Sequence, residues 1–236
     1  MIWNLNHMDF DTFEEKAGVK FKNRALLKQA FTHRSYINEN RDSGLEHNER
    51  LEFLGDAILE LVITDYLYHK REDSDEGELT SLRSALVNAD TCAKVATKLE
   101  VNDYLLLSKG ESKDVGRARL YILANALEAI IGAIYIDQGY DKAKEFILTH
   151  VAPIMEEILS GGSWIDPKSL FQEKAQEFIG ETPVYKTIRE SGPDHDKHFT
   201  VAVTVSAKTY GEGEGKSKQD AEQAAARNAL DKQGWK

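Results

Sequence analysis

The spacing of apolar residues divides the chain into a helical first part and a mixed second part. Apolar positions that recur three or four residues apart predict helices over 10–31 (two short ones), 48–69, 78–99, 120–136 and 141–159. Alternation of apolar and polar residues follows, and the pattern there predicts a helix at 168–179, strands at 183–190, 198–206 and, shorter, near 207–212, and a final helix opened by Ser217. The second part therefore has the order α-β-β-β-α.

The boundary between the two parts lies at Ser160-Gly161-Gly162-Ser163, a composition typical of a flexible linker. Asp166 and Pro167 then lead into the next predicted helix. We expect an all-α domain over 1–159, a flexible linker over 160–166 and a small α+β domain over 167–236.

One face of the predicted helix 48–69 is acidic. Glu49, Glu52 and Asp56 stand at i, i+3 and i+7, which places three carboxylates on one side of the helix. Like charges this close repel each other, and a cation that takes oxygen ligands, such as Mg²⁺, would offset the repulsion. The alternative is a solvated acidic face on an amphipathic helix. The apolar stripe expected to be buried beside these residues consists of Leu51, Leu54, Ile58, Leu61 and Val62.

The predicted helix 120–136 is apolar on almost all sides, which is typical of the central helix of a helical domain. It is slightly short for a membrane span and contains Asn125 and Glu128, which share a face at i and i+3. A lone carboxylate within such a helix must be paired or bound to a metal ion. With Glu52 and Asp56 nearby, metal binding is the favoured interpretation of Glu128.

Charge is distributed unevenly over the 236 residues, whose net charge is −10. Residues 167–236 contain 11 Lys or Arg and 11 Asp or Glu, whereas residues 1–166 contain 19 against 29. An acidic total argues against a nucleic-acid partner, but this objection weakens if part of the acidity is a metal site. Cys92 is the only cysteine, so no internal disulfide is possible, which fits a reducing cytoplasm. The N-terminal residues do not resemble a secretion signal, and we expect no membrane partner.

Several other polar residues have a structural interpretation as well as a functional one. His33 could face a phosphate, although a His beside an apolar segment is more often structural. Glu76 stands at the start of a helix, where a carboxylate interacts favourably with the helix dipole. Ser217 and Asp220 form a capping box. No Ser-His-Asp or Cys-His arrangement is legible, which disfavours catalysis by a protein nucleophile.

Residues 48–57, Asn-Glu-Arg-Leu-Glu-Phe-Leu-Gly-Asp-Ala, resemble the motif of the bacterial ribonuclease III family. The segments that support the resemblance follow in order: 32–36 (Thr-His-Arg-Ser-Tyr), 75–79 (Asp-Glu-Gly-Glu-Leu) and 125–135. Residues 168–234 are similar to a double-stranded-RNA-binding domain, with the marks Gly192-Pro193-Asp194-His195 and Gly215-Lys216-Ser217-Lys218.

The resemblance implies a homodimeric, all-α endonuclease domain that cleaves both strands of an RNA duplex with the help of Mg²⁺, or of Mn²⁺ as a substitute. The products implied are 5′-phosphate and 3′-hydroxyl ends with short 3′ overhangs, in the processing of rRNA and other structured RNA in the cytoplasm. Phe53 would lie at the dimer contact. Transferred residue by residue, the metal ligands would be Glu52, Asp56, Asn125 and Glu128, and the catalytic residues would be Glu49, Asp56, Glu76 and Glu128.

In the second domain, the resemblance implies contacts across two minor grooves and the phosphates between them. Lys216, Lys218 and the helix N-terminus at Ser217 suit the phosphates, although the same residues could form an ordinary solvated cap. Position 219, commonly basic, is Gln in this chain. The residues expected at the minor grooves are Gln172 and Glu173 on the first helix, and Pro193, Asp194 and His195 between the strands.

Asn125 departs from the family pattern, because members commonly have Asp at this position. An amide oxygen can still bind Mg²⁺, but it contributes no negative charge. The leading hypothesis is a processing endoribonuclease. The alternatives are a double-stranded-RNA-binding protein whose nuclease site Asn125 weakens or silences, and a purely structural RNA-assembly factor. The presence of the other acidic residues together favours the enzyme.

Overall fold

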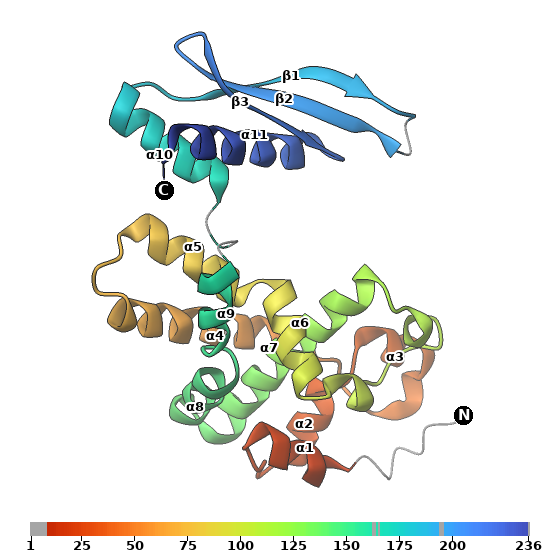
Figure 1. The fold of residues 1–236 in the computed structure, drawn as a ribbon. Helices are drawn as coiled ribbons and strands as arrows, with labels where there is room; N and C mark the ends of the chain where they lie inside the picture. The colour runs from red at the N-terminus through yellow and green to blue at the C-terminus, as the bar shows by residue number, and fades with distance from the viewer. Residues whose placement is uncertain (1–8, 162–163, 165, 194–195, 236) are drawn as a thin grey trace. The chain divides into compact units, whose positions relative to one another are not determined.

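The computed structural model describes residues 9–161, 164, 166–193 and 196–235. The chain divides into two compact units, Met1–Gly161 and Gly162–Lys236, which we describe separately (Figure 1). The first is helical, and the second contains a three-stranded antiparallel sheet with helices.

The first unit, which is helical, contains nine α-helices and three short 3-10 helices among its described residues. The α-helices are α1 (Phe10–Ala17), α2 (Arg24–Ala30), α3 (Arg34–Glu39), α4 (Glu49–Lys70), α5 (Glu76–Val87), α6 (Ala89–Lys98), α7 (Arg117–Gln138), α8 (Tyr140–His150) and α9 (Ile154–Gly161). The 3-10 helices are η1 (Arg41–Ser43), η2 (Val101–Tyr104) and η3 (Glu111–Lys113).

The closest helix packing in this unit is the crossing of α4 and α7, which depends on two glycines. A Cβ atom on Gly55 of α4 would lie 1.7 Å from the backbone oxygen of Glu128 on α7. A Cβ atom on Gly132 would lie 2.2 Å from the backbone oxygen of Leu51. Real side chains never approach backbone this closely, so any larger residue would force the helices apart.

Helix α7 lies at the centre of the first unit. It is long and apolar enough to pass a composition test for a membrane-crossing helix, but 61% of its most apolar window is buried inside the protein. Its flanks contact α6, α8 and α2 in addition to α4. The prediction of a central helix at 120–136 is therefore confirmed.

Two predicted helices are each divided in the structure. The predicted helix 78–99 is interrupted at Asn88, whose side-chain oxygen accepts a hydrogen bond of 2.9 Å from the Thr91 amide and so caps α6. The predicted helix 141–159 breaks between α8 and α9, next to Pro153, because proline cannot continue the hydrogen bonding of a helix. Ser160 and Gly161 belong to α9 and not to the linker. Leu61, expected to be buried, is 56% exposed, and Leu59 and Ile63 are buried instead.

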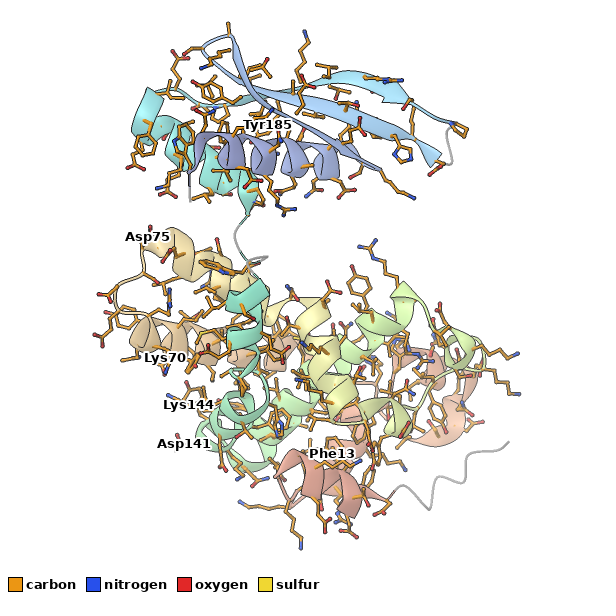
Figure 2. The ribbon with its side chains drawn as sticks, in the orientation of Figure 1. Phe13, Lys70, Asp75, Asp141, Lys144 and Tyr185 are labelled. Atoms are coloured by element: carbon orange, nitrogen blue, oxygen red, sulfur yellow. The ribbon has the colours of Figure 1, made fainter. Side chains whose placement is uncertain are left out.

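The second unit has the predicted order α-β-β-β-α. Its helices are α10 (Pro167–Ile179) and α11 (Lys218–Gln233), and its strands β1 (Val184–Ser191), β2 (His198–Val205) and β3 (Lys208–Gly215) are adjacent in sequence order. The core between sheet and helices includes Phe171, Val201, Val203, Ala225 and Ala229, and Tyr185 packs against it (Figure 2).

Strand β3 is longer than predicted and runs through the glycines expected to lie beyond it. Gly213 faces α11, where a Cβ atom would lie 2.1 Å from the Ala225 amide nitrogen. Gly211 and Gly215 face α11 in the same way. Glycine on the strand and alanine on the helix together let α11 lie directly against the sheet, as the narrow apolar stripe of the helix predicts.

Candidate active site and RNA-binding surface

The crossing of α4 and α7 brings together the acidic residues predicted from the two helices. Glu52 and Asp56 come from α4, and Glu128 comes from α7. The backbone oxygen of Glu128 is the atom that Gly55 of α4 approaches. Burial of the Glu128 side chain, followed by the charges of Asp56 and Glu52, raises the pKa of Glu128 to about 8. Asp56 and Glu52 are therefore close enough to Glu128 for their charges to act on it, and the metal-binding role of the three carboxylates stays a prediction.

Asn125 belongs to the same group. Burial, followed by the charges of Glu49 and Asp56, raises the pKa of Glu52, and a hydrogen bond from the Asn125 side chain acts in the opposite direction. The amide of Asn125 thus donates to the Glu52 carboxylate. An aspartate at this position would accept instead of donating and would add a further negative charge.

The two supporting carboxylates differ in position. Glu49 is exposed at the first turn of α4, where its oxygens lie 3.4 Å from Arg34 Nη1 and 3.7 Å from His47 Nδ1. Glu76 is exposed at the first turn of α5, next to the capping residue Asp75 (Figure 2). Among the described residues, Glu76 is not one of the charges that shift the pKa of Glu52 or Glu128.

The donor set at this crossing, here called the acidic site, fits a hard divalent cation. Its members offer carboxylate and amide oxygens, the ligands that Mg²⁺ and Mn²⁺ take. Within the described part of the chain, no three His, Cys, Asp or Glu side chains stand close enough to hold a metal ion by themselves. The ion could be held by Glu52, Asp56 and Glu128 together with the amide oxygen of Asn125.

Sequence reasoning missed the role of Asn48, which fixes the start of α4. Its side chain is buried and donates a 3.1 Å hydrogen bond to the Ala30 carbonyl, and its backbone amide donates to the Thr32 carbonyl at 2.9 Å. The start of α4, three residues before Glu52, is thereby tied to the end of α2. The signal available in the sequence was that Asn48 is the first residue of the family motif at 48–57.

His33 has the structural role that was the more common expectation. It stands at the N-cap of α3, a helix the sequence did not predict, and its Nδ1 accepts from the Ser35 amide at 3.3 Å. Burial is the main cause that lowers the pKa of the His33 imidazole. Ser35 in turn accepts a 3.0 Å hydrogen bond from the Ser108 amide.

Cys92 lies behind the acidic site and has no catalytic character. Its side chain is fully buried, and burial, with smaller effects of Glu128 and Asp56, raises the pKa of its thiol to about 12. A thiol this difficult to ionise is a poor nucleophile.

The predicted RNA-contact residues that the structure describes are all exposed. Gln172 and Glu173 lie on α10, Pro193 follows β1, and Lys216 and Lys218 flank the N-terminus of α11. Ser217 is the N-cap of α11 and accepts a 3.1 Å hydrogen bond from the Asp220 amide, as predicted. Asp194 and His195 lie outside the described residues, so their predicted contacts remain predictions.

Phe53 is 80% exposed on the surface of α4. It stands beside an open depression of about 560 Å³, whose apolar lining includes Leu26, Leu54 and Ile136. A large exposed aromatic side chain beside an apolar depression is a feature of protein–protein interfaces.

A helical unit with a half-buried group of carboxylates, followed by an α-β-β-β-α unit that presents lysines, defines the class of double-stranded-RNA nucleases. The Ribonuclease-III-like family model matches residues 23–155, and the double-stranded RNA binding motif matches residues 167–233. The chain belongs to the ribonuclease III family, whose members are divalent-metal-dependent nucleases.

Relatives of known identity agree over nearly the whole chain. Ribonuclease 3 of Oceanobacillus iheyensis is 46% identical over 227 residues, which are 95% of this chain and 98% of the relative. Ribonuclease 3 of Protochlamydia amoebophila is 47% identical over 219 residues, which are 92% of this chain and 89% of the relative. The nuclease domain of ribonuclease III from Campylobacter jejuni, whose structure is known, is 41% identical with a TM-score of 0.56, covering 61% of this chain and 97% of that domain.

The raised pKa of Glu128 predicts a pH-dependent stability of the metal-free protein. The native state holds the Glu128 proton up to a pH of about 8, whereas an unfolded Glu releases it near its ordinary pKa of 4.5. The native state therefore binds more protons in this interval, and stability falls as the pH rises through it. Glu128→Gln removes this loss, so its Tm should exceed that of the parent by roughly 2–4 °C at a pH of about 8 and by less near pH 5.

The measurement is thermal unfolding in the presence of a chelator at several pH values. Glu15→Gln is the matched control, because Glu15 is exposed on α1 and is not one of the charges that shift the pKa of Glu52 or Glu128. A Tm difference between Glu128→Gln and the parent that does not grow with pH would contradict the prediction.

Proposed function

We propose that this protein is an endoribonuclease that hydrolyses both strands of double-stranded RNA at the acidic site, with Mg²⁺ as the natural ion. The observation that supports the proposal most directly is that Glu52 of α4 and Glu128 of α7 are half-buried, and that burial, followed by the charges of Asp56 and Glu52, raises the pKa of Glu128. Charges gathered in this way are unfavourable for the folded protein on its own. Such an arrangement is explained by a bound cation, which relieves the repulsion.

The residues of the acidic site have separate tasks in this proposal. Glu52, Asp56, Asn125 and Glu128 would hold the ion, which would supply charge stabilisation at the scissile phosphate and a lowered pKa of the attacking water. Glu49 adds negative charge beside Glu52, and the catalytic role predicted for Glu76 rests on the family resemblance alone. We infer products with 5′-phosphate and 3′-hydroxyl ends and short 3′ overhangs, and a role in processing rRNA and other structured RNA.

The second unit, Gly162–Lys236, is here called the RNA-binding unit and supplies the substrate contacts. The phosphates between two minor grooves would meet Lys216, Lys218 and the N-terminus of α11, whose capped first turn presents backbone amides. Gln172 and Glu173 on α10 would meet one minor groove, and Pro193 with its neighbours Asp194 and His195 would meet the next. Their exposure supports these assignments for the residues that the structure describes.

We further propose that the protein works as a homodimer in which Phe53 of each protomer enters the depression of the other. A two-fold axis requires that the same surface provide both partners of the contact, and α4 carries Phe53 and part of the depression. The nuclease domain from Campylobacter jejuni has a region involved in dimer formation, which supports the proposal.

The function is tested by Glu128→Gln. Loss of one ligand charge should reduce cleavage of duplex RNA with magnesium by roughly three orders of magnitude, since a metal ion contributes several kcal/mol to such a transition state. Binding of the duplex in chelator should stay within a few-fold, because the RNA contacts proposed lie mostly in the other unit. Cleavage and binding assays on the parent, Glu128→Gln and the control Glu15→Gln check this. Substantial cleavage by Glu128→Gln would remove Glu128 from the metal site.

The dimer is tested by Phe53→Ala. We expect the parent to sediment as a dimer at micromolar concentration and Phe53→Ala to dissociate at least about tenfold more readily, because a buried aromatic anchor carries much of an interface's binding energy. Tyr68→Ala is the control, as Tyr68 is 69% exposed on the same helix, about 22 Å further along its axis. A monomeric parent, or equal behaviour of the two variants, would refute the role of Phe53.

Asn125→Asp tests the departure from the family pattern. The added charge should bring half-maximal activity to a magnesium concentration about tenfold lower, since one charge at contact distance contributes about a kcal/mol or more. The parent should need more magnesium or work better with manganese. Without metal, Asn125→Asp should melt at a lower temperature, because the hydrogen bond to Glu52 is replaced by repulsion, and magnesium should raise its Tm more than that of the parent.

The titration of activity and Tm with magnesium separates the possible outcomes. An unchanged magnesium midpoint together with a lower metal-free Tm would mean that Asn125 is a buried structural amide and not a ligand. A parent that binds duplex RNA but cleaves none with either ion, while Asn125→Asp cleaves, would establish the alternative of a binding protein silenced at this position.

A further inference from the structure

Two acidic residues of the RNA-binding unit are paired with the lysines that face RNA. Lys218 Nζ lies 3.4 Å from Glu190 Oε1, and Lys216 Nζ lies 3.6 Å from Asp196 Oδ1. Glu190 is near the end of β1, and Asp196 precedes β2, whereas the lysines flank the start of α11. The tertiary fold, and not helical spacing, therefore places these charges together.

Each of the two carboxylates also approaches a second basic side chain. Glu190 Oε2 lies 3.7 Å from Lys197 Nζ, and Asp196 Oδ1 lies 3.7 Å from His198 Nε2. The ammonium group of Lys218 also faces an aromatic ring, since its Nζ stands 5.6 Å from the centre of the Phe199 ring. The carboxylates thus sit among the positive groups of this edge and not at its margin.

All four partners are accessible to solvent and to a ligand. The side chains of Lys216 and Lys218 are 78% and 60% exposed, and those of Asp196 and Glu190 are 57% and 42% exposed. Exposed ion pairs of this kind are weak and screened by salt. A row of RNA phosphates can therefore displace the carboxylates, but after displacement the carboxylates remain beside the phosphates as like charges.

The charge balance of the unit makes this local arrangement important. Residues 167–236 contain equal numbers of basic and acidic residues, 11 of each. The unit has no net positive charge that would attract RNA over a distance, so its affinity depends on the few lysines at the phosphate contact. Glu190 and Asp196 are placed where they reduce that attraction most.

We propose that Glu190 and Asp196 restrain the binding of nucleic acid by competing with its phosphates for Lys218 and Lys216. The proposal rests on the RNA-binding role given above to these two lysines. Phosphate attraction holds any nucleic acid regardless of its form, whereas contacts across two minor grooves require the shape of duplex RNA. By weakening the first, the two carboxylates make binding depend on the second.

The test is the binding of duplex RNA by the full chain in chelator, which prevents cleavage, at roughly 50 to 200 mM salt. Glu190→Gln and Asp196→Asn together should tighten binding roughly 3- to 10-fold at the low end of this range. The slope of log affinity against log salt should steepen by about 0.9 for each carboxylate removed, as each exposes one more net positive charge to RNA. Duplex DNA of the same length should gain by a similar factor, because phosphate contacts do not read the sugar.

Asp231→Asn is the matched control. It removes the same charge from an exposed residue of α11, but about 20 Å along the helix from Lys218, beyond the screening length at these salt concentrations. Its affinity and salt slope should be those of the parent. A change equal to that of the double variant would show a general charge effect and would overturn the pairing argument.

The pairing itself is tested by combining Glu190→Gln with Lys218→Ala. If Glu190 acts by occupying Lys218, the gain from Glu190→Gln should shrink by half or more when Lys218 is absent. An unchanged gain would overturn the proposal, and so would unchanged or weaker binding by the double carboxylate variant, since the carboxylates would then be inert or would hold the lysines in place for RNA. If instead the parent binds no duplex RNA, it is the RNA-binding assignment that fails, so the two failures are distinguishable.

Discussion

The close crossing of α4 and α7 is the constraint on which the helical unit, Met1–Gly161, depends. Gly55 and Gly132 allow backbone to meet backbone there, and the Gly55 contact is made with the carbonyl of Glu128 itself. A ligand on α7 is thus fixed against the helix that carries Glu52 and Asp56. The buried amide of Asn48 holds the start of α4 to the end of α2, so the register of the acidic face is set from outside the crossing. The position of the acidic site is therefore a consequence of helix packing and not of a flexible loop.

This geometry concentrates charge that the folded chain does not neutralise by itself. Glu52 and Glu128 both have raised pKa values, with burial as the first cause and neighbouring carboxylates as the next. Asn125 moderates the effect, because its amide donates to Glu52 where an acidic residue would repel it. Asparagine in place of an acidic residue at position 125 also lowers the negative charge available to a cation. Stability without metal and affinity for metal are consequently opposed at this one position.

Much of this architecture could be predicted from the sequence, and the failures have identifiable causes. Apolar spacing located α4, α7 and the α-β-β-β-α order, since these elements have strong periodicity. The breaks at Asn88 and Pro153 were missed because apolar residues continue with helical spacing on both sides of them. Strand β3 was underestimated because its glycines look like loop residues and become intelligible only when α11 lies against them. Its hairpin also lacks an Asn-Gly pair: Ser206 and Ala207 adopt positive φ angles of 50° and 64° instead.

The ion pairs of the RNA-binding unit could not be predicted from sequence at all, because residues near 190, 196 and 217 meet only after the sheet and α11 have assembled. Once assembled, the unit uses charge in the opposite way to the acidic site. At the crossing of α4 and α7, like charges lie close together, and a bound cation would relieve their repulsion. At the start of α11, opposite charges are paired in advance, so that a phosphate must displace a carboxylate to bind. The first arrangement favours a ligand and the second restrains one. An enzyme that must hold its metal but release cleaved duplex benefits from both.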